Sequence, residues 1–294
     1  MSDGELRWDA LAGEWVAIAA GRQNRPNRPA GGCPFCVGGL EAPEPYEVKA
    51  FPNRWPMYRP GDPVTLDRAA GSAPAHGASE VVLYSPEHDM SLHGLGIAGV
   101  RRVVDLWAER TAELLARPEV EYVLVFENRG AEAGATIPHP HGQIYAFPFV
   151  PPVPAREAEV VARDGCALCT APPEELVVHD GPGWRAWVPY ASGWPYGLLL
   201  APHGHVPGLP ELDGEGRDDL AAALVDVLAR YDRLFERPFP YMLWVHHGPH
   251  LHVHVATPLR ARETMRYVAA GELGSGLLTN PVAPERAAQE LRDA

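Results

Sequence analysis

Two histidines and a glutamine alternate in the segment "ATIPHPHGQIYAFPF" (135–149). Side chains two residues apart point to the same face of a strand, so His139, His141 and Gln143 should line one side. A neutral imidazole is a good nucleophile toward phosphorus near pH 7, whereas an amide can donate to a phosphate oxygen but cannot act as an acid. The segment therefore predicts a two-step covalent transfer at phosphorus, with His141 as the nucleophile. The missing side chain of Gly142 would let a phosphate approach the backbone.

Two Cys-x-x-Cys pairs, "CPFC" and "CALC", are more typical of a metal or redox site than of a disulfide in a cytosolic chain. The candidate ligands in the first half are Cys33, Cys36, His88 and His139. Two thiolates and two imidazoles suit tetrahedral Zn²⁺, and four protein ligands leave no open coordination position. The sequence thus predicts a structural zinc site that holds His139 and leaves His141 outside the metal shell.

The same order of features occurs twice along the chain. A Cys-x-x-Cys pair, a strand followed by a histidine, a helix, a second strand and a His-x-His strand follow one another in each half. For example, "EYVLVFENRG" is echoed by "PYMLWVHHGP", and "HPHGQIYAF" by "LHVHVATP". We expect an α+β fold built from two copies of an antiparallel sheet with a helix, related by a pseudo-two-fold axis within the chain. Segments 1–150 and 151–294 are the two predicted domains.

Matching the repeats predicts a second metal site in the second half. Its expected ligands are Cys166, Cys169, His205 and His252. As in the first half, this would be a closed, structural site.

Charge and composition exclude several classes of function. The chain of 294 residues has a formal charge of −13 and one lysine, so it is a poor candidate for binding nucleic acid. No apolar run is long enough to cross a membrane, and the acidic, polar start is not a signal peptide, so we expect a cytoplasmic protein. The usual glycine-rich phosphate loops are absent from the sequence.

The motif "HPHGQ" and its surroundings resemble the galactose-1-phosphate uridylyltransferase family, the transferase branch of the histidine-triad superfamily. The resemblance extends over nearly the whole chain, including "GRQNRP", "FPNRW" and "VFENRGAEAGATIPHPHGQ". It implies a histidine-triad-like unit in each half, with His141 as the uridylylated residue and Gln143 as its phosphate partner. The residues that it implies for binding the nucleotide and its phosphates are Arg22, Arg25, Asn53, Asn128 and Thr136.

The resemblance also implies a reaction and its partners. His141 would take UMP from UDP-glucose, release glucose 1-phosphate, and pass UMP to galactose 1-phosphate in a ping-pong sequence. The implied cofactor of the first metal site is Zn²⁺, and family members are homodimers. A second metal site, holding Zn²⁺ or Fe²⁺, would have the ligands Glu157, His246, His252 and His254. This set competes for His252 with the set derived from the repeats.

The sugar-binding segment departs from the family pattern and leaves the acceptor open. In "RYVAAGE", Glu272 matches the hexose-contacting carboxylate, but Arg266 stands where lysine is usual and Gly271 where tyrosine is usual. Alternatives are therefore the same chemistry with ADP- or GDP-sugars or an unusual hexose, and a nucleotide hydrolase of the wider superfamily. A zinc-stabilised binding module without turnover would require that His141 is dispensable.

Overall fold

One antiparallel sheet of nine strands runs through the protein. The computed structural model describes residues 4–24 and 32–294. In spatial order the strands are β3 (Lys49–Pro52), β5 (Ala78–Leu83), β7 (His141–Phe147), β6 (Tyr122–Arg129), β11 (Tyr241–His246), β12 (His252–Ala256), β10 (Leu198–Pro202), β9 (Trp184–Trp187) and β8 (Val177–Asp180). Every neighbouring pair in this sheet is antiparallel.

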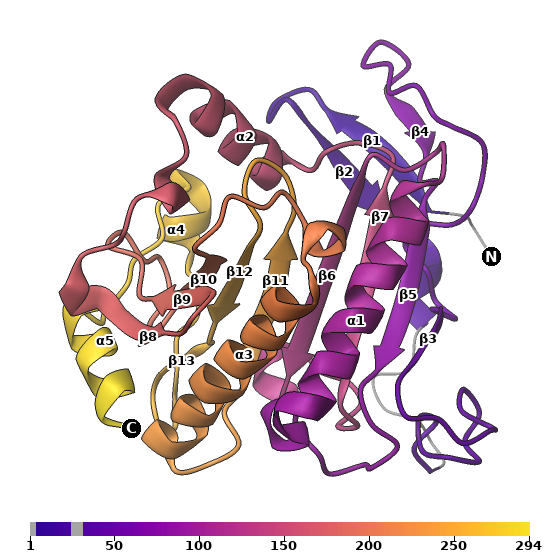
Figure 1. Ribbon diagram of the computed structural model, residues 1–294. Coiled ribbons are helices and arrows are strands. Elements are labelled where there is room, and N and C mark those ends of the chain that lie inside the picture. The colour runs from indigo at the N-terminus through magenta and orange to yellow at the C-terminus, as the bar shows by residue number, and fades with distance from the viewer. Residues whose placement is uncertain (1–3, 25–31) are drawn as a thin grey trace.

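The order of the strands confirms the predicted duplication. From β6 outward the first half reads β6, β7, β5, β3, and from β11 outward the second half reads β11, β12, β10, β9. The central pair β6–β11 joins the halves, and Phe126 lies opposite Trp244 in it. The helix α1 (Gly96–Leu115) of the first half and α3 (Gly214–Phe235) of the second lie side by side on one face of the sheet (Figure 1). The α+β fold with an internal pseudo-two-fold axis is therefore as expected.

The main core lies between the sheet and these two helices. Alternate residues of the central strands, such as Val125 and Val245, face the helices and are fully buried with Trp107 of α1. Burial of one face of each strand sets the register, because a shift by one residue would turn the apolar side chains outward. At the start of α3, Asp213 accepts a hydrogen bond from the backbone N–H of Gly216 at 2.8 Å, which caps the helix.

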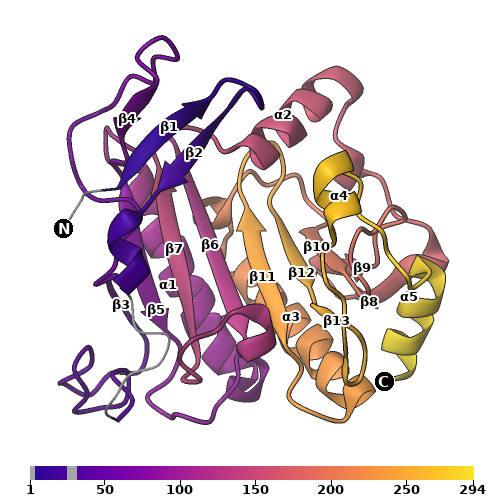
Figure 2. The ribbon, with the colours of Figure 1, turned by 180° about the vertical axis from the view of Figure 1, so that it is seen from behind.

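The opposite face of the sheet is only partly covered (Figure 2). A small sheet of β1 (Glu5–Asp9), β2 (Glu14–Ile18) and β4 (Ser72–Pro74) packs over Tyr145 and Phe147. The remaining helices and strands are α2 (Pro152–Asp164), α4 (Ala270–Ser275), α5 (Pro284–Asp293), β13 (Leu259–Ala261), β14 (Thr264–Met265), and the 3-10 helices η1 (Ala20–Asn24), η2 (His93–Leu95), η3 (Ala131–Ala133), η4 (Ala167–Cys169), η5 (Glu174–Leu176) and η6 (Leu209–Glu211).

The two halves share one sheet and one core. Because β6 and β11 are hydrogen-bonded neighbours, the sheet continues across the predicted boundary between 1–150 and 151–294. The boundary between 1–150 and 151–294 therefore separates two repeats within one sheet, and the division into two domains stays a prediction. Among the described residues, no helix is both long and apolar enough to cross a bilayer.

Candidate active site

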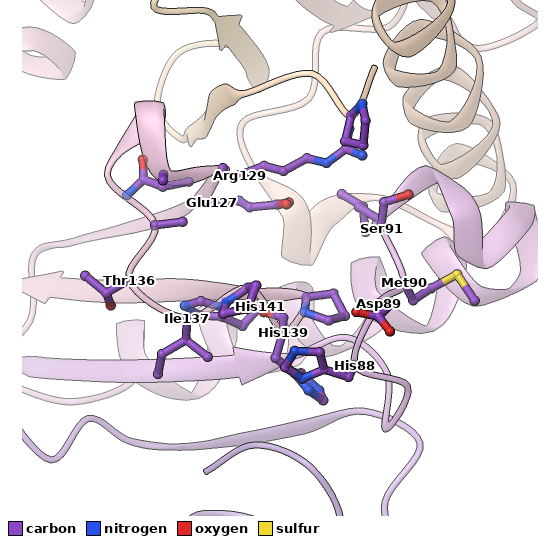
Figure 3. A pocket seen from close by; sticks show the side chains of 18 of the residues that line it. His88, Asp89, Met90, Ser91, Glu127, Arg129, Thr136, Ile137, His139 and His141 are labelled. Atoms are coloured by element: carbon purple, nitrogen blue, oxygen red, sulfur yellow. Dashed lines mark hydrogen bonds between the residues drawn. The ribbon is translucent and has the colours of Figure 1, made fainter. Parts of the chain in front are cut away.

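A cavity of about 730 Å³ opens where β6 ends and β7 begins. We call it the strand-end cavity; Figure 3 shows His139 and His141 on one side of it and Glu127 and Arg129 on the other. It lies at the edge of the sheet because Asn128 and Arg129 close β6 while His141 opens β7. His88, Asn128 and Thr136 also line its wall.

A smaller hollow of about 220 Å³ adjoins this cavity. Its walls are mostly apolar and include Phe35, Phe51 and Val81, with Asn53 and Gln143 as polar members. We call it the apolar hollow. His141, Thr136, Ile137 and Pro34 belong to the lining of both spaces, so His141 stands at the point where they meet.

The backbone selects the tautomer of His141. Its Nδ1 lies 2.7 Å from the carbonyl oxygen of His139, and a carbonyl can only accept, so Nδ1 carries the proton. Nε2 of the neutral ring therefore keeps its lone pair. The ring of Phe35 packs edge-on against it, with centroids 5.1 Å apart. Gln143 follows two residues later on the same strand face and shares the apolar hollow with His141.

Gly142 has a different role from the one that the sequence suggested. A Cβ at this position would lie 2.1 Å from the hydroxyl oxygen of Tyr84 and 3.1 Å from the carbonyl oxygen of Phe126. Alternate strand residues point to opposite faces, so Gly142 faces the buried core while His141 and Gln143 face the hollows. The glycine makes room for Tyr84 behind the strand; the expectation that it admits a phosphate was wrong.

The first predicted metal group is assembled next to His141. The ligand atoms of Cys33, Cys36, His88 and His139 all lie within 4.8 Å of one another. Cys36 Sγ is 3.5 Å from His88 Nδ1 and 3.7 Å from His139 Nδ1. A tetrahedral zinc shell separates its ligand atoms by about 3.3–3.8 Å, given the usual Zn–S and Zn–N bonds. His139 donates from Nε2 to the Ser85 carbonyl oxygen at 2.7 Å, so its Nδ1 is available to a metal.

A second Cys2His2 group lies in the other half, but with a different histidine from the one expected. The four side chains are Cys166, Cys169, His205 and His250. His250 Nδ1 is 3.3 Å from Cys166 Sγ, and His205 Nδ1 is 3.1 Å from Cys169 Sγ. The assignment of His252 to this set was wrong. His250 immediately precedes Leu251 and β12 as His139 precedes Pro140 and β7, so His250 is the counterpart of His139 and His252 that of His141.

The rival set also exists, as a third and separate group. Glu157 on α2 meets three histidines: its Oε2 lies 2.9 Å from His246 Nδ1 and 3.6 Å from His252 Nε2, and its Oε1 lies 4.0 Å from His254 Nε2. Burial opposes ionisation of Glu157, but hydrogen bonds from His246 and His252 outweigh it and lower its pKa. The two sets do not compete for His252, so the described residues contain three groups that could each hold a metal ion.

Comparison with known proteins agrees with this arrangement. The model described as "Galactose-1-phosphate uridyl transferase, N-terminal domain" matches residues 41–151, and the one described as its C-terminal domain matches 159–294. The chain belongs to the galactose-1-phosphate uridyl transferase family. Relatives named galactose-1-phosphate uridylyltransferase from Thermotoga maritima and Streptomyces lividans are 36% and 35% identical to it, each over 98% of this chain and over 98% and 86% of their own lengths.

Solved structures of other proteins have the same fold. A structure titled "Structure of uridylyltransferase" superimposes with a TM-score of 0.87 at 31% identity and covers 98% of both chains. An ADP-glucose phosphorylase from Arabidopsis thaliana with bound ADP-glucose gives a TM-score of 0.78 at 24% identity, over 99% of both chains, and shares the fold.

The residues that the family resemblance implies for binding the nucleotide lie in different parts of the site. Asn128 and Thr136 line the strand-end cavity, and Asn53 lines the apolar hollow. Arg22 donates to the hydroxyl of Tyr145 at 3.1 Å, on the strand face that carries His141 and Gln143. Arg25 lies outside the described residues.

Arg266 and Glu272 lie away from this site. They form an ion pair with each other, and Arg266 stacks its guanidinium over the ring of Trp194, 4.5 Å from its centroid. Glu272 also accepts from the backbone N–H groups of Ala269 and Thr279, at 3.0 and 2.7 Å. Neither residue is in the lining of the strand-end cavity or the apolar hollow within this chain.

The sequence did not reveal every residue of the site. Glu127 and Arg129 in the wall of the strand-end cavity were not singled out, because each looks like an ordinary strand residue. Arg129 binds Asp232 of α3 through two hydrogen bonds of 2.7 and 2.9 Å. His250 could have been found from the complete His-x-His-x-His alternation "HLHVH".

Proposed function

We propose that this protein transfers UMP from UDP-glucose to galactose 1-phosphate through a uridylyl intermediate on His141. The position and tautomer of His141 carry the proposal: its Nδ1–H is bound to the His139 carbonyl oxygen at 2.7 Å, and the ring belongs to both spaces of the site. The names of the family relatives support the substrates.

The two spaces suit the two parts of a nucleotide sugar. The apolar hollow has aromatic walls and the amide of Asn53, which suit a uracil ring that stacks and forms hydrogen bonds. The larger strand-end cavity is left for the sugar phosphate, with Asn128 and Thr136 near His141. The phosphorus between the two parts then lies beside His141.

The transfer has two balanced steps. The Nε2 lone pair of His141 attacks the α-phosphorus of UDP-glucose, a P–N bond forms, and the P–O bond to glucose 1-phosphate breaks. A phosphate oxygen of galactose 1-phosphate then attacks the same phosphorus, and the P–N bond breaks to give UDP-galactose and neutral His141. Both the leaving group and the acceptor are phosphates, so neither step requires a strong general acid.

Gln143 favours transfer over hydrolysis. Its amide can donate to a nonbridging phosphate oxygen as charge develops, and a well-placed donor of this kind contributes about 3–4 kcal/mol. The amide cannot deliver a proton to a poor leaving group or take one from water. Phosphate acceptors are therefore favoured over water.

Metal ions have a structural role in this proposal. The Cys2His2 groups fit Zn²⁺ in ligand type and spacing, and the group of Glu157 with three histidines suits Zn²⁺ or Fe²⁺. With Zn²⁺ bound, Cys33, Cys36, His88 and His139 would hold one another rigidly. The carbonyl oxygen of His139 accepts the hydrogen bond from Nδ1 of His141, so the orientation of the nucleophile would then be fixed as well.

A homodimer would explain the positions of Arg266 and Glu272. These residues lie away from His141 in their own chain. The same segment exposes large apolar side chains, with Tyr267 77% and Leu273 75% exposed, which suits contact with a neighbouring subunit. We propose a cytoplasmic homodimer in which this segment reaches the sugar phosphate at the partner's site.

Intact-mass spectrometry after mixing with UDP-glucose tests the proposal. We expect a uridylyl adduct on the wild-type protein, its loss on addition of galactose 1-phosphate, and no adduct on His141→Ala. The matched control is His203→Ala, which removes a histidine of the second half that lies outside both spaces of the site. Absence of an adduct with UDP-glucose, together with an adduct from ADP- or GDP-glucose, would instead support the related sugar-nucleotide phosphorylase chemistry.

A further inference from the structure

A third cavity, of about 310 Å³, lies in the second half between α2 and the start of β12. Its lining includes Val161 of α2, Leu168 between the two cysteines, Leu199 of β10, and His252 and His254 of β12. Figure 2 shows α2 beyond the ends of β11 and β12. We call this space the α2 cavity.

The pseudo-two-fold axis relates the α2 cavity to the apolar hollow beside His141. Leu168 is the third residue of "CALC" as Phe35 is of "CPFC". Leu199 lies opposite His254 in the sheet as Val81 lies opposite Gln143. Each of these six side chains lines the cavity of its own half.

The histidine at the nucleophile position is oriented in the same way in both cavities. His252 Nδ1 lies 2.8 Å from the carbonyl oxygen of His250, and His141 Nδ1 lies 2.7 Å from that of His139. The second half thus keeps the shape of the site. Nε2 of His252, however, lies 3.6 Å from Glu157 and belongs to the third metal group, so it cannot act as a nucleophile.

The second half has no counterpart of Asn53, the residue whose amide would form hydrogen bonds with a base in the apolar hollow. Phe51 lies opposite Val81, and Trp187 lies opposite the equivalent Leu199, so Asn53, two residues beyond Phe51, corresponds to Pro189. A proline side chain cannot form the hydrogen bonds of an amide. The second copy therefore lacks the group that would distinguish one base from another.

The mouth of the α2 cavity carries a positive charge beside the apolar walls. Arg156 of α2 is exposed and belongs to the lining, and its guanidinium suits a phosphate.

We propose that the α2 cavity is a second, unreactive nucleotide site. It takes a nucleoside monophosphate with the base against Leu168 and Leu199 and the phosphate toward Arg156, and it does not select the base. The inference rests on the proposed function in one respect: the apolar hollow must be where UMP places its base.

Equilibrium dialysis with labelled UMP, on protein with its metals in place, tests this inference. We expect two UMP per wild-type chain and one per chain in Leu168→Trp, in which the larger ring fills the α2 cavity. Val161→Trp fills the same cavity from α2, away from the cysteines, and should also bind one. Both variants should keep the metal content and the transfer activity of the wild type. Unlabelled AMP should displace UMP from the second site with an affinity similar to that of UMP.

The outcomes separate this inference from the proposed function. Asn53→Ala should weaken only the UMP site beside His141. One UMP per wild-type chain, lost in Asn53→Ala and kept in both tryptophan variants, would overturn the second site and leave the proposed function standing. Two UMP per chain in both tryptophan variants would also overturn it. If Asn53→Ala changed neither site, the assignment of the apolar hollow would fail, and the inference with it.

Discussion

At the scale of single residues, the chemistry depends on one ring nitrogen and the amide beside it. The bond from His141 Nδ1 to the carbonyl oxygen of His139 selects the tautomer with a lone pair on Nε2. That carbonyl belongs to a residue of the first metal group. A metal ligand and a nucleophile two positions apart on one strand edge therefore act together, because the first orients the second.

Gln143→His should increase hydrolysis relative to transfer. An imidazole at this position could supply and accept the protons that an amide cannot, so water would become a better acceptor. We expect the ratio of hydrolysis to transfer to rise roughly 100-fold, the lower end of what a general acid contributes. The ratio is measured from the UMP and UDP-galactose formed from UDP-glucose and galactose 1-phosphate. Gln143→Glu is the control, and an unchanged ratio in Gln143→His would contradict this account of the amide.

Gly142→Ala should destabilise the protein and lower its activity. The new methyl group would meet the Tyr84 hydroxyl oxygen at 2.1 Å, and both groups are held in a packed core, so we expect a loss of about 1–3 kcal/mol. Adding Tyr84→Phe removes the nearest atom and should restore part of the loss. Chemical unfolding of the two single variants and the double variant measures this. Equal effects of Gly142→Ala with and without Tyr84→Phe would show that the contact is not the cause.

At the scale of elements, the start of a strand decides which histidine faces which partner. His139 and His250 each lie two residues before the first residue of β7 and β12. Their side chains point toward the two Cys-x-x-Cys pairs. His141 and His252, the first residues of the strands, point toward the apolar hollow and the α2 cavity. If the repeats are aligned two residues out of register, so that His252 is paired with His139, the metal-binding histidine and the cavity-facing histidine of the second half are confused.

His250→Ala should remove metal from the second cysteine group, and His252→Ala should not. In protein substituted with Co²⁺, thiolate ligation gives a charge-transfer absorption that reports only the cysteine groups. We expect this absorption to fall by about half in His250→Ala, which removes one of two such sites. The loss of a structural metal should also cost about 3 kcal/mol of stability. A fall in His252→Ala with none in His250→Ala would restore the original assignment.

The sequence predicts features of the site that depend on neighbouring residues in one strand. It does not predict features that depend on how distant segments meet in the fold. The alternation of His141 and Gln143 is a property of any strand, so their common face could be predicted. The separation of the groups that contain His250 and His252 depends on which residue begins β12, and the Gly248–Pro249 turn before the strand does not fix that residue. The resemblance suggested Glu157 with His246, which lie 89 residues apart and 2.9 Å from each other. Spacing within a segment could not reveal that contact.

At the scale of the whole molecule, buried polar contacts join the two halves beside the active site. Tyr241 of β11 donates to Glu127 Oε1 of β6 at 2.9 Å, and Arg129 of β6 binds Asp232 of α3 at 2.7 and 2.9 Å. Such contacts fix the angle between β6 and the second half, because buried polar groups tolerate few alternative arrangements. The strand-end cavity lies partly on this junction, since Phe239 of the second half also lines it.

Glu127 should make the stability of this junction depend on pH. Burial raises its pKa to about 7, although the hydroxyl of Tyr241 opposes the shift. The folded protein thus binds this proton more tightly than the unfolded chain, whose glutamates titrate near pH 4.3. The stabilising contribution is complete below about pH 4.3 and is lost as the pH rises through about 7, by about 3 kcal/mol in total.

Glu127→Gln therefore should lose this pH dependence while keeping an acceptor for Tyr241. We expect the variant to gain stability relative to the wild type between pH 5 and pH 8, as measured by the difference in their thermal midpoints at each pH. The other titrating groups are common to both proteins and cancel in that difference. Glu121→Gln, at an exposed position just before β6, should show no such change. If the midpoints of Glu127→Gln and the wild type differed by the same amount at both pH values, the buried carboxyl would not be the titrating group, and the polar contact across β6 and β11 would be insensitive to pH.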